Sequence, residues 1–99
     1  MLLIIGTVRL PLDRIEQAKP AMERMISASR AESGCLDYSY AQDVLDPGLI
    51  RVSEAWSDRA ALEAHFKSAH IVQWRASWAE LGIGDRKLTL YETDGGAPT

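Results

Sequence analysis

The alternation of hydrophobic and polar positions changes its period several times along the chain. Residues 2 to 10 are almost continuously apolar, which is typical of a strand, and Pro11 ends this strand because proline has no N–H to donate. From residue 12 the apolar spacing of three and four predicts an amphipathic helix through Leu12, Ile15, Ala18, Met22, Met25 and Ile26. Pro20 predicts a kink or a late helix start, and Gly34 ends the helix.

The next two segments have the two-residue period of half-buried strands. Tyr38 and Tyr40 alternate with polar residues in a predicted strand over residues 35 to 44. Asp46-Pro47-Gly48 suits a type II turn, because proline fixes φ and glycine accepts a positive φ. A third strand then has one face formed by Ile50, Val52, Glu54 and Trp56, so the pattern predicts a hairpin.

A second amphipathic helix and a fourth strand complete the pattern. Ser57 or Asp58 can cap the helix, which Gly82 and Gly84 end, and its apolar stripe comprises Ala61, Leu62, His65, Phe66, Trp74, Trp78 and Leu81. Residues 87 to 93 alternate again. We therefore expect one domain over residues 1 to 94 and a flexible tail over residues 95 to 99.

The order β-α-β-β-α-β predicts a ferredoxin-like α+β fold, with a four-stranded antiparallel sheet and two helices on one face. The other face is then uncovered, although several strands carry apolar residues on both sides. Large exposed apolar patches are rare on soluble monomers. A second copy of the sheet is the simplest cover, so we expect a homodimer in the form of a dimeric α+β barrel.

Composition narrows the classes of partner. The formal net charge is −3, and no Lys/Arg cluster is present, which argues against nucleic acid. The apolar start is too short to span a bilayer and lacks a basic leader, so no membrane partner is expected. Cys35 is the only cysteine, which excludes an intramolecular disulfide and favours a cytoplasmic location. We expect Cys35 to be a small buried residue.

The two histidines are the first candidates for chemistry. His65 and His70 are five residues apart, which separates them by roughly 140° on an unbroken helix, so a shared metal is not expected unless Ser68 or Ala69 breaks that helix. His65 shares a helix face with Leu62 and Phe66. It is either a buried imidazole satisfied by hydrogen bonds, or a general base or polar anchor in a cavity between helix and sheet.

Glu54 and Trp56 lie on the same face of the predicted third strand. Glu54 would be a buried carboxylate there, and Trp56 an aromatic side chain wedged into the core. A buried carboxylate is costly without a partner, so Glu54 needs an arginine, a histidine or a backbone donor. His70, Trp74 and Trp78 follow one another at intervals of four along one helical ridge. Core packing is the favoured interpretation for both tryptophans of this ridge.

The segment "EAWSDRAALEAHFKSAH", residues 54 to 70, resembles the signature of the antibiotic biosynthesis monooxygenase (ABM) family. The shared features are Glu-x-Trp at the end of the third strand and His-x-x-[ST]-x-His at His65, Ser68 and His70. "GCLDYSYAQDVLDPG", residues 34 to 48, is also similar. The resemblance is greatest to the quinol-monooxygenase-like branch. It covers nearly the whole chain in element order, with specific motifs only in residues 34 to 74.

This resemblance implies a homodimeric α+β barrel with a pocket between sheet and helices in each subunit. It implies oxidation of a quinol or phenolic aromatic by molecular oxygen with no metal, flavin or haem cofactor, and a deprotonated dihydroxyaromatic can itself pass an electron to oxygen. His65 is the implied catalytic base or anchor. The implied substrate-binding residues are Trp56, Glu54, Tyr40, His70, Phe66 and Trp74.

Two other branches of the family fit less well. The polyketide-oxidising branch has Asn and Tyr where this chain has Val52 and Leu62. The haem-degrading branch has a Trp at the position of His65, and its Asn and haem-ligating His fall near Thr7 and at Trp74 or Arg75. Haem degradation is therefore disfavoured.

Two alternatives to oxidation remain open, because a motif fixes a fold better than a reaction. One is a non-oxidative isomerase or epimerase that uses His65 on a small polar metabolite. The other is a non-catalytic dimeric stress protein that binds a small molecule. An aromatic-lined cavity around His65 favours oxidation or aromatic binding, whereas inward Arg or Lys side chains favour an anionic ligand.

Overall fold

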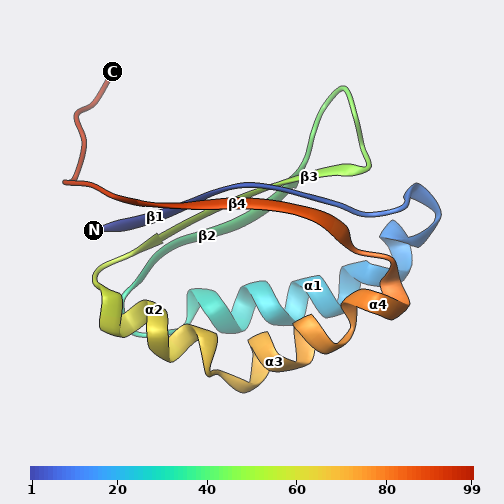
Figure 1. Ribbon diagram of the computed structural model, residues 1–99, viewed down its shortest axis with the longest axis horizontal. Helices are drawn as coiled ribbons and strands as arrows, with labels where there is room; N and C mark the ends of the chain where they lie inside the picture. Colours follow the sequence, from blue (N-terminus) through green and yellow to red (C-terminus); the bar gives the residue numbers. More distant parts are fainter.

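The computed structural model describes residues 1 to 99 and contains one antiparallel sheet covered on one face by helices (Figure 1). The strand order is β2-β3-β1-β4. The strands are β1 (Leu2–Arg9), β2 (Cys35–Gln42), β3 (Leu49–Trp56) and β4 (Gly84–Glu92). The helical layer comprises a 3-10 turn η1 (Leu12–Arg14), α1 (Ile15–Arg30), α2 (Arg59–Phe66), α3 (Ala69–Ala76) and α4 (Trp78–Leu81). The predicted α+β ferredoxin-like fold is confirmed.

The core lies between the sheet and the helical layer. Alternation in β1 directs Leu2, Ile4 and Val8 into this core, whereas Ile5 is 48% exposed on the opposite face. Trp56, Tyr38 and Met25 are the largest fully buried side chains. Burial of this apolar surface holds the helices on the sheet, at about 25 cal/mol per Å² removed from water.

Pro20 lies inside α1, which begins at Ile15 and runs without a break to Arg30. A helix that starts late, at Pro20, is therefore the wrong alternative. The chain turns after Arg30, and Gly34 has a positive φ of 83° in that turn. A Cβ at Gly34 would lie 2.6 Å from the Cβ of Ala61, so glycine allows the turn to approach α2 closely.

The predicted second helix is three helices rather than one. Ser68 has an extended backbone, with ψ of 149°, and its Oγ donates to the carbonyl oxygen of His65 at 2.6 Å. Ser77 Oγ likewise donates to the carbonyl oxygen of Trp74 at 2.6 Å, where α3 gives way to α4. A serine hydroxyl that bonds a nearby carbonyl competes with the helix, which explains both breaks. Asp58 is the N-cap of α2, since its Oδ1 accepts from the Ala61 N–H at 2.8 Å.

The hairpin between β2 and β3 is confirmed, but its turn is not type II. The Leu49 N–H donates to the Asp46 carbonyl oxygen at 2.9 Å, and Gly48 does not have the positive φ that a type II turn requires. Cys35, at the start of β2, is partly exposed rather than buried.

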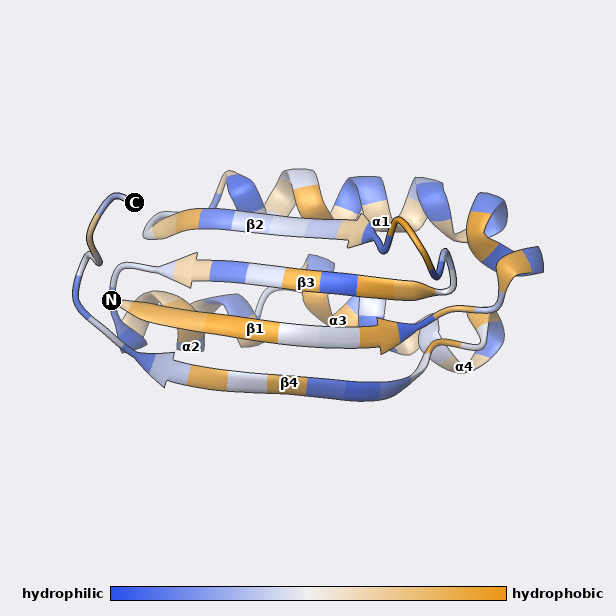
Figure 2. Cartoon of the chain, turned by 90° about the horizontal axis from the view of Figure 1, so that it is seen from above, coloured by the Kyte–Doolittle hydropathy of each residue, from blue (hydrophilic) through white to orange (hydrophobic).

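The face of the sheet opposite the helices is open. Figure 2 shows β1 between β3 and β4, with a hydrophobic first half. Ile5 and Tyr91 are 48% and 52% exposed, and the hairpin tip carries Val44 and Leu45 at 95% and 93% exposure. The tip rises on this open side (Figure 1). None of the helices is long and apolar enough to cross a membrane.

Candidate functional site

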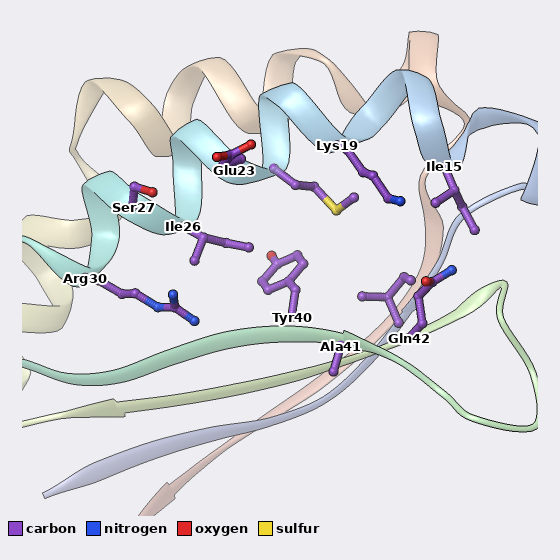
Figure 3. Close-up of a pocket in the computed structure, with 11 residues that line it drawn as sticks. Ile15, Lys19, Glu23, Ile26, Ser27, Arg30, Tyr40, Ala41 and Gln42 are labelled. Carbon is purple, nitrogen blue, oxygen red and sulfur yellow. The ribbon is translucent and has the colours of Figure 1, made fainter.

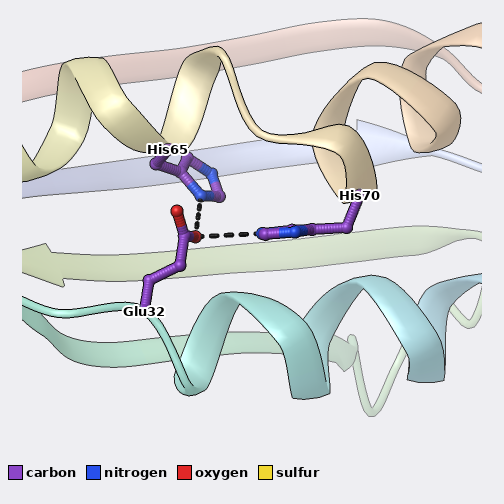
Figure 4. Close-up of side chains that lie close together, drawn as sticks. All are labelled: Glu32, His65 and His70. Atoms are coloured by element: carbon purple, nitrogen blue, oxygen red, sulfur yellow. Dashed lines mark hydrogen bonds and ion pairs between the residues drawn. The ribbon is translucent and has the colours of Figure 1, made fainter.

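A carboxylate joins the two histidines (Figure 4). Glu32 lies in the turn after α1, His65 in the last turn of α2 and His70 at the start of α3. Glu32 Oε2 lies 2.5 Å from His65 Nδ1 and 3.0 Å from His70 Nε2. The two imidazole rings have centroids 6.0 Å apart. The expected divergence of the histidines is therefore wrong, and the arrangement is built around Glu32, which the sequence did not suggest.

The helix break at Ser68 brings the histidines together. An unbroken helix would place His65 and His70 roughly 140° apart, but the extended Ser68 redirects the chain between them. Ser68 Oγ also lies 3.1 Å from His70 Nε2, so the residue that breaks the helix helps to orient the second ring. The Ser of the His-x-x-[ST]-x-His motif therefore has a physical role in the site.

The contact with Glu32 determines which nitrogen of His65 faces the core. A carboxylate accepts hydrogen bonds, so Nδ1 carries the proton and donates to Glu32, which leaves Nε2 with a free lone pair in the neutral ring. Burial lowers the pKa of His65 below its usual value, and Glu32 partly opposes that shift. His65 is therefore a neutral imidazole at pH 7, with a basic nitrogen directed away from Glu32.

Glu54 lies close to this free nitrogen. Its Oε1 is 4.0 Å from His65 Nε2 and accepts a hydrogen bond from Trp56 Nε1 at 3.0 Å. The predicted partners of Glu54 were arginine, histidine or a backbone donor; the structure places the histidine His65 beside it, and adds the Trp56 indole as its hydrogen-bond donor. Burial raises the pKa of Glu54, with Trp56 the leading opposing influence. A separation of 4.0 Å exceeds hydrogen-bond length, and leaves space for a bridging oxygen.

The side chains of His65 and Glu54 line a small cavity between the sheet and the helices. Its volume is about 20 Å³, which is room for about one water molecule. Its aromatic lining comprises Tyr38, Tyr40, Phe66, Trp74 and Trp78. Arg75 and Arg86 complete the polar part of the lining. Water is largely excluded here, so a charge that forms beside His65 interacts strongly with Glu32 and Glu54.

The aromatic rings pack directly on His65. The Trp56 ring centroid is 4.5 Å from that of His65, and the Tyr38 centroid is 5.3 Å from it. Burial raises the pKa of Tyr38 far above its usual value, so its phenol stays protonated at physiological pH. These contacts restrict the imidazole to one orientation.

The structure places the seven predicted site residues in two groups. Five of them line the cavity, namely Tyr40, Glu54, His65, Phe66 and Trp74. Trp56 lies outside the lining and supports Glu54 and His65 from the core, while His70 lies on the far side of Glu32. Sequence reasoning missed Glu32, Tyr38, Arg75, Trp78 and Arg86. The only available signal for Glu32 was an isolated acid in the turn before Gly34.

A larger groove lies between α1 and the edge strand β2 (Figure 3). Its volume is about 510 Å³. Ile26 and Tyr40 lie within it, and Lys19 and Gln42 are placed towards its end near Ile15 (Figure 3). Tyr40 lines both this groove and the cavity beside His65, so the two spaces share a wall residue.

Glu32, His65 and His70 also offer three donor atoms that lie within 4.8 Å of one another. One carboxylate oxygen and two imidazole nitrogens form a donor set that suits zinc. Ligands about 2.0 to 2.1 Å from a tetrahedral zinc ion are roughly 3.3 Å apart. The Glu32 to histidine contacts of 2.5 and 3.0 Å are shorter and have the length of hydrogen bonds, so metal binding would require the side chains to separate.

The sheet, the helical layer and the cavity define a ferredoxin-like α+β domain whose interior holds an imidazole and two carboxylates. Comparison with protein families gives a match to the antibiotic biosynthesis monooxygenase model over residues 1 to 77. The chain therefore belongs to the antibiotic biosynthesis monooxygenase family. The matched residues include Glu32, Glu54, His65 and His70, so the whole hydrogen-bonded cluster lies inside the family domain.

Solved structures share this fold over almost their full length. A candidate antibiotic biosynthesis monooxygenase from Deinococcus radiodurans has a TM-score of 0.91 at 24% identity, covering 100% of this chain and 98% of that one. Rv0793 from Mycobacterium tuberculosis has a TM-score of 0.82 at 25% identity, covering 98% of both chains. At this level of identity, the likeness establishes the fold.

Two curated proteins are similar in sequence. Rv0793, a candidate monooxygenase, is 35% identical over 60 residues, which are 61% of this chain and 58% of that protein. The Synechocystis protein sll1783 is 24% identical over 91 residues, which are 92% of this chain and 62% of that protein. The aligned regions therefore span about three fifths of the length of these two relatives.

Proposed function

We propose that this protein is a cofactor-independent monooxygenase that oxidises a quinol or phenolic aromatic with molecular oxygen, with His65 as the general base. The observation that carries the proposal is the contact of Glu32 Oε2 with His65 Nδ1 at 2.5 Å, which leaves Nε2 unprotonated beside the cavity. Membership of the ABM family supports the reaction class. A base with these properties can remove the hydroxyl proton of a bound phenol.

The chemistry balances without a cofactor. His65 Nε2 takes one hydroxyl proton of the dihydroxyaromatic, and the resulting anion passes an electron to oxygen to give superoxide and a ring radical. These two combine at a ring carbon to form a peroxide anion, which takes the proton back from the His65 imidazolium to become a hydroperoxide. The hydroperoxide then loses its terminal OH together with the proton of the same ring carbon as water, which leaves a hydroxyquinone and neutral His65. The substrate is the only electron donor and loses four electrons overall to molecular oxygen; one oxygen atom enters the product and the other leaves as water.

The surrounding residues suit this role for His65. Glu32 is on one side of the ring and Glu54 Oε1 is 4.0 Å from Nε2 on the other, so both stabilise the imidazolium that forms. The aromatic lining suits a flat ring. A cavity of about 20 Å³ must open to admit one, and Phe66, which is 40% exposed, is the most exposed of its aromatic wall residues.

We also propose that the protein is a homodimer whose open sheet faces pack together. Ile5 and Tyr91 on this face are each about half exposed, and a second sheet would remove them from water. Val44 and Leu45 at the hairpin tip extend this apolar surface. The cavity lies on the opposite side of the sheet, so each subunit would hold a complete cavity.

Oxygen consumption tests the proposed reaction. Purified protein is mixed with a panel of dihydroxyaromatics in an oxygen electrode, and wild type is compared with His65→Ala. Glu63→Ala is the matched control, because Glu63 is exposed on the same helix. We expect oxygen uptake by wild type and the control, a loss of about 100-fold or more in His65→Ala, and one labelled oxygen atom in the product from ¹⁸O₂. Uptake that is absent, or equal in all three proteins, would refute the proposed role of His65.

One observation favours a second candidate function, an isomerase or epimerase of a small anionic metabolite. Arg75 and Arg86 line the same cavity as His65, and arginines suit an anionic ligand. Such an enzyme would convert its substrate without consuming oxygen. Turnover of a candidate ligand at equal rates in air and under argon would support this function over oxidation.

A further inference from the structure

The cavity beside His65 contains two arginines without a partner in the protein. Arg75 on α3 and Arg86 on β4 both line it, and neither guanidinium makes a hydrogen bond or an ion pair within the chain. Asp85, the acid next to Arg86, lies 3.6 Å from Lys87 instead. By contrast, Arg9, Arg51 and Arg59 each pair with a carboxylate. The two cations of the cavity are therefore free to bind an anion.

Aromatic rings hold these two guanidinium groups in place. The Arg75 Cζ lies 5.4 Å from the centroid of the Phe66 ring, and the Arg86 Cζ lies 5.8 Å from that of Trp78. A guanidinium over an aromatic face keeps its N–H groups at the edge of its plane available for an oxygen ligand. Both arginines are exposed, so they lie where the cavity meets solvent.

The same cavity is lined by side chains that carry two further unsatisfied donors. The indole Nε1–H groups of Trp74 and Trp78 are buried and have no hydrogen-bond partner. An unpaired buried donor is unfavourable, because it has lost its hydrogen bonds to water without gaining one in the protein. Indole and guanidinium groups donate but cannot accept, so four neighbouring groups around one cavity lack an acceptor. An anionic oxygen group is the ligand that this combination recognises best.

Sheet geometry separates these donors from the proposed base. Glu54 is opposite Ile4 in the sheet, whereas Arg86 lies near the level of Val8, four residues further along β1. At about 3.3 Å per residue, this is a separation of roughly 13 Å between backbone positions, which the long arginine side chain shortens. The cavity thus has a basic, carboxylate-containing end at His65 and a cationic end at Arg75 and Arg86.

We propose that the substrate is a hydroxylated aromatic acid, bound with its anionic oxygen group at Arg75, Arg86 and the indole N–H groups, and with its hydroxyl at His65. The placement of the hydroxyl rests on the proposed function, whereas the anion subsite does not. The aromatic lining distinguishes this ligand class from a phosphorylated sugar, which offers no ring face to Tyr38, Trp74 or Phe66.

Binding under argon tests the subsite without turnover. The probes are 2,5-dihydroxybenzoate, hydroquinone, which is the same ring without the carboxylate, and glycerol phosphate, an anion without a ring. The variants are Arg75→Met and Arg86→Met, which keep an apolar stem over the aromatic ring. Lys87→Met is the matched control, because Lys87 follows Arg86 on β4 and points to the opposite face. Tryptophan fluorescence or calorimetry reports affinity.

We expect wild type and Lys87→Met to bind dihydroxybenzoate at least about tenfold more tightly than hydroquinone or glycerol phosphate. Each arginine variant should lose about tenfold in affinity for dihydroxybenzoate and keep its affinity for hydroquinone. Equal affinity for dihydroxybenzoate and hydroquinone, or an equal loss for both in the arginine variants, would overturn the anion subsite. Glycerol phosphate that binds as tightly as dihydroxybenzoate would overturn the aromatic part of the proposal.

The outcome is separable from that of the proposed oxidation. If dihydroxybenzoate binds through the arginines but consumes no oxygen, the subsite stands and monooxygenation fails. If hydroquinone is oxidised but the carboxylate adds no affinity, monooxygenation stands and the anion subsite is refuted.

Discussion

Glu32 and His65 are 33 residues apart in the chain, and their side chains meet at 2.5 Å through Oε2 and Nδ1. This contact assigns the proton of the imidazole to Nδ1 and so makes Nε2 the basic nitrogen of the cavity. The positive φ of Gly34 lets the turn after α1 pack against α2, and the helix break at Ser68 brings His70 to the same carboxylate.

Replacement of Glu32 tests whether this contact matters for catalysis. Glu32→Gln keeps the size of the side chain and removes its charge, so we expect kcat to fall by roughly 10- to 100-fold, as for other residues that orient a catalytic histidine. Glu32 also raises the pKa of His65, so the acidic limb of the rate profile should move to lower pH in the variant. A lower rate with an unchanged pH profile would show that Glu32 orients His65 but does not raise its pKa, and an unchanged rate would show that the contact does not matter for catalysis.

The buried His65 should make stability depend on pH in a defined direction. Burial lowers its folded-state pKa below the unfolded value near 6.5, so the unfolded chain takes up a proton first as pH falls. The free energy of unfolding should therefore be fully retained above about pH 6.5 and decrease below it. Glu54, with a raised pKa, contributes in the opposite direction.

Urea unfolding of wild type and His65→Gln separates the two contributions, because Glu54 is present in both proteins. Wild type should lose more stability than His65→Gln between pH 7.5 and 5.5. Equal losses in the two proteins would show that the imidazole is not desolvated in the folded state.

The fold could be predicted because its signals are local. The almost continuous apolar run of β1, and the alternation in β2 around Tyr38 and Tyr40, are strong enough to define strands without tertiary information. The break at Ser68 was not predictable in the same way. A serine tolerates a helix interior, and only the hydrogen bond of its hydroxyl to the His65 carbonyl shows that it interrupts this one.

The candidate site was only partly predictable, because only some of its residues lie on elements with a local periodic signal. Glu54 and His65 lie on recognisable periodic elements, so their inward direction follows from the pattern. Glu32 lies in a turn, where no period constrains the side chain, and its partners are 33 and 38 residues away. Arg75 is exposed on a helix, and its position over Phe66 depends on the angle between α2 and α3 after the break.

Leu62 tests the packing of α2 against the sheet. It is 2% exposed, so Leu62→Ala should lower the free energy of unfolding by about 2 to 5 kcal/mol through lost burial and the cavity left behind. Val72→Ala on α3 is the control, because Val72 is 58% exposed and should change stability by about 0.5 kcal/mol or less. Chemical denaturation measures both. Similar effects at the two positions would contradict the buried face assigned to α2.

Removal of metal ions tests whether Glu32, His65 and His70 bind a metal ion. The short contacts within this cluster are hydrogen bonds, so dialysis against a chelator should leave oxygen uptake unchanged. Activity measured before and after dialysis gives the answer, with metal content determined by mass spectrometry. Activity that is lost and then restored by zinc would instead identify the three side chains as metal ligands.

Ile5 tests the proposed packing of two sheets. It alternates with the buried Ile4 and is 48% exposed on the open face, so a charge there would have to be buried in a dimer. Ile5→Glu should therefore convert a dimer into a monomer in sedimentation experiments, at an unchanged helix content. Val72→Glu introduces the same charge on the helical layer, where Val72 is 58% exposed, and should leave the dimer intact. A wild-type monomer, or a dimer that persists in Ile5→Glu, would show that this sheet face is not the interface.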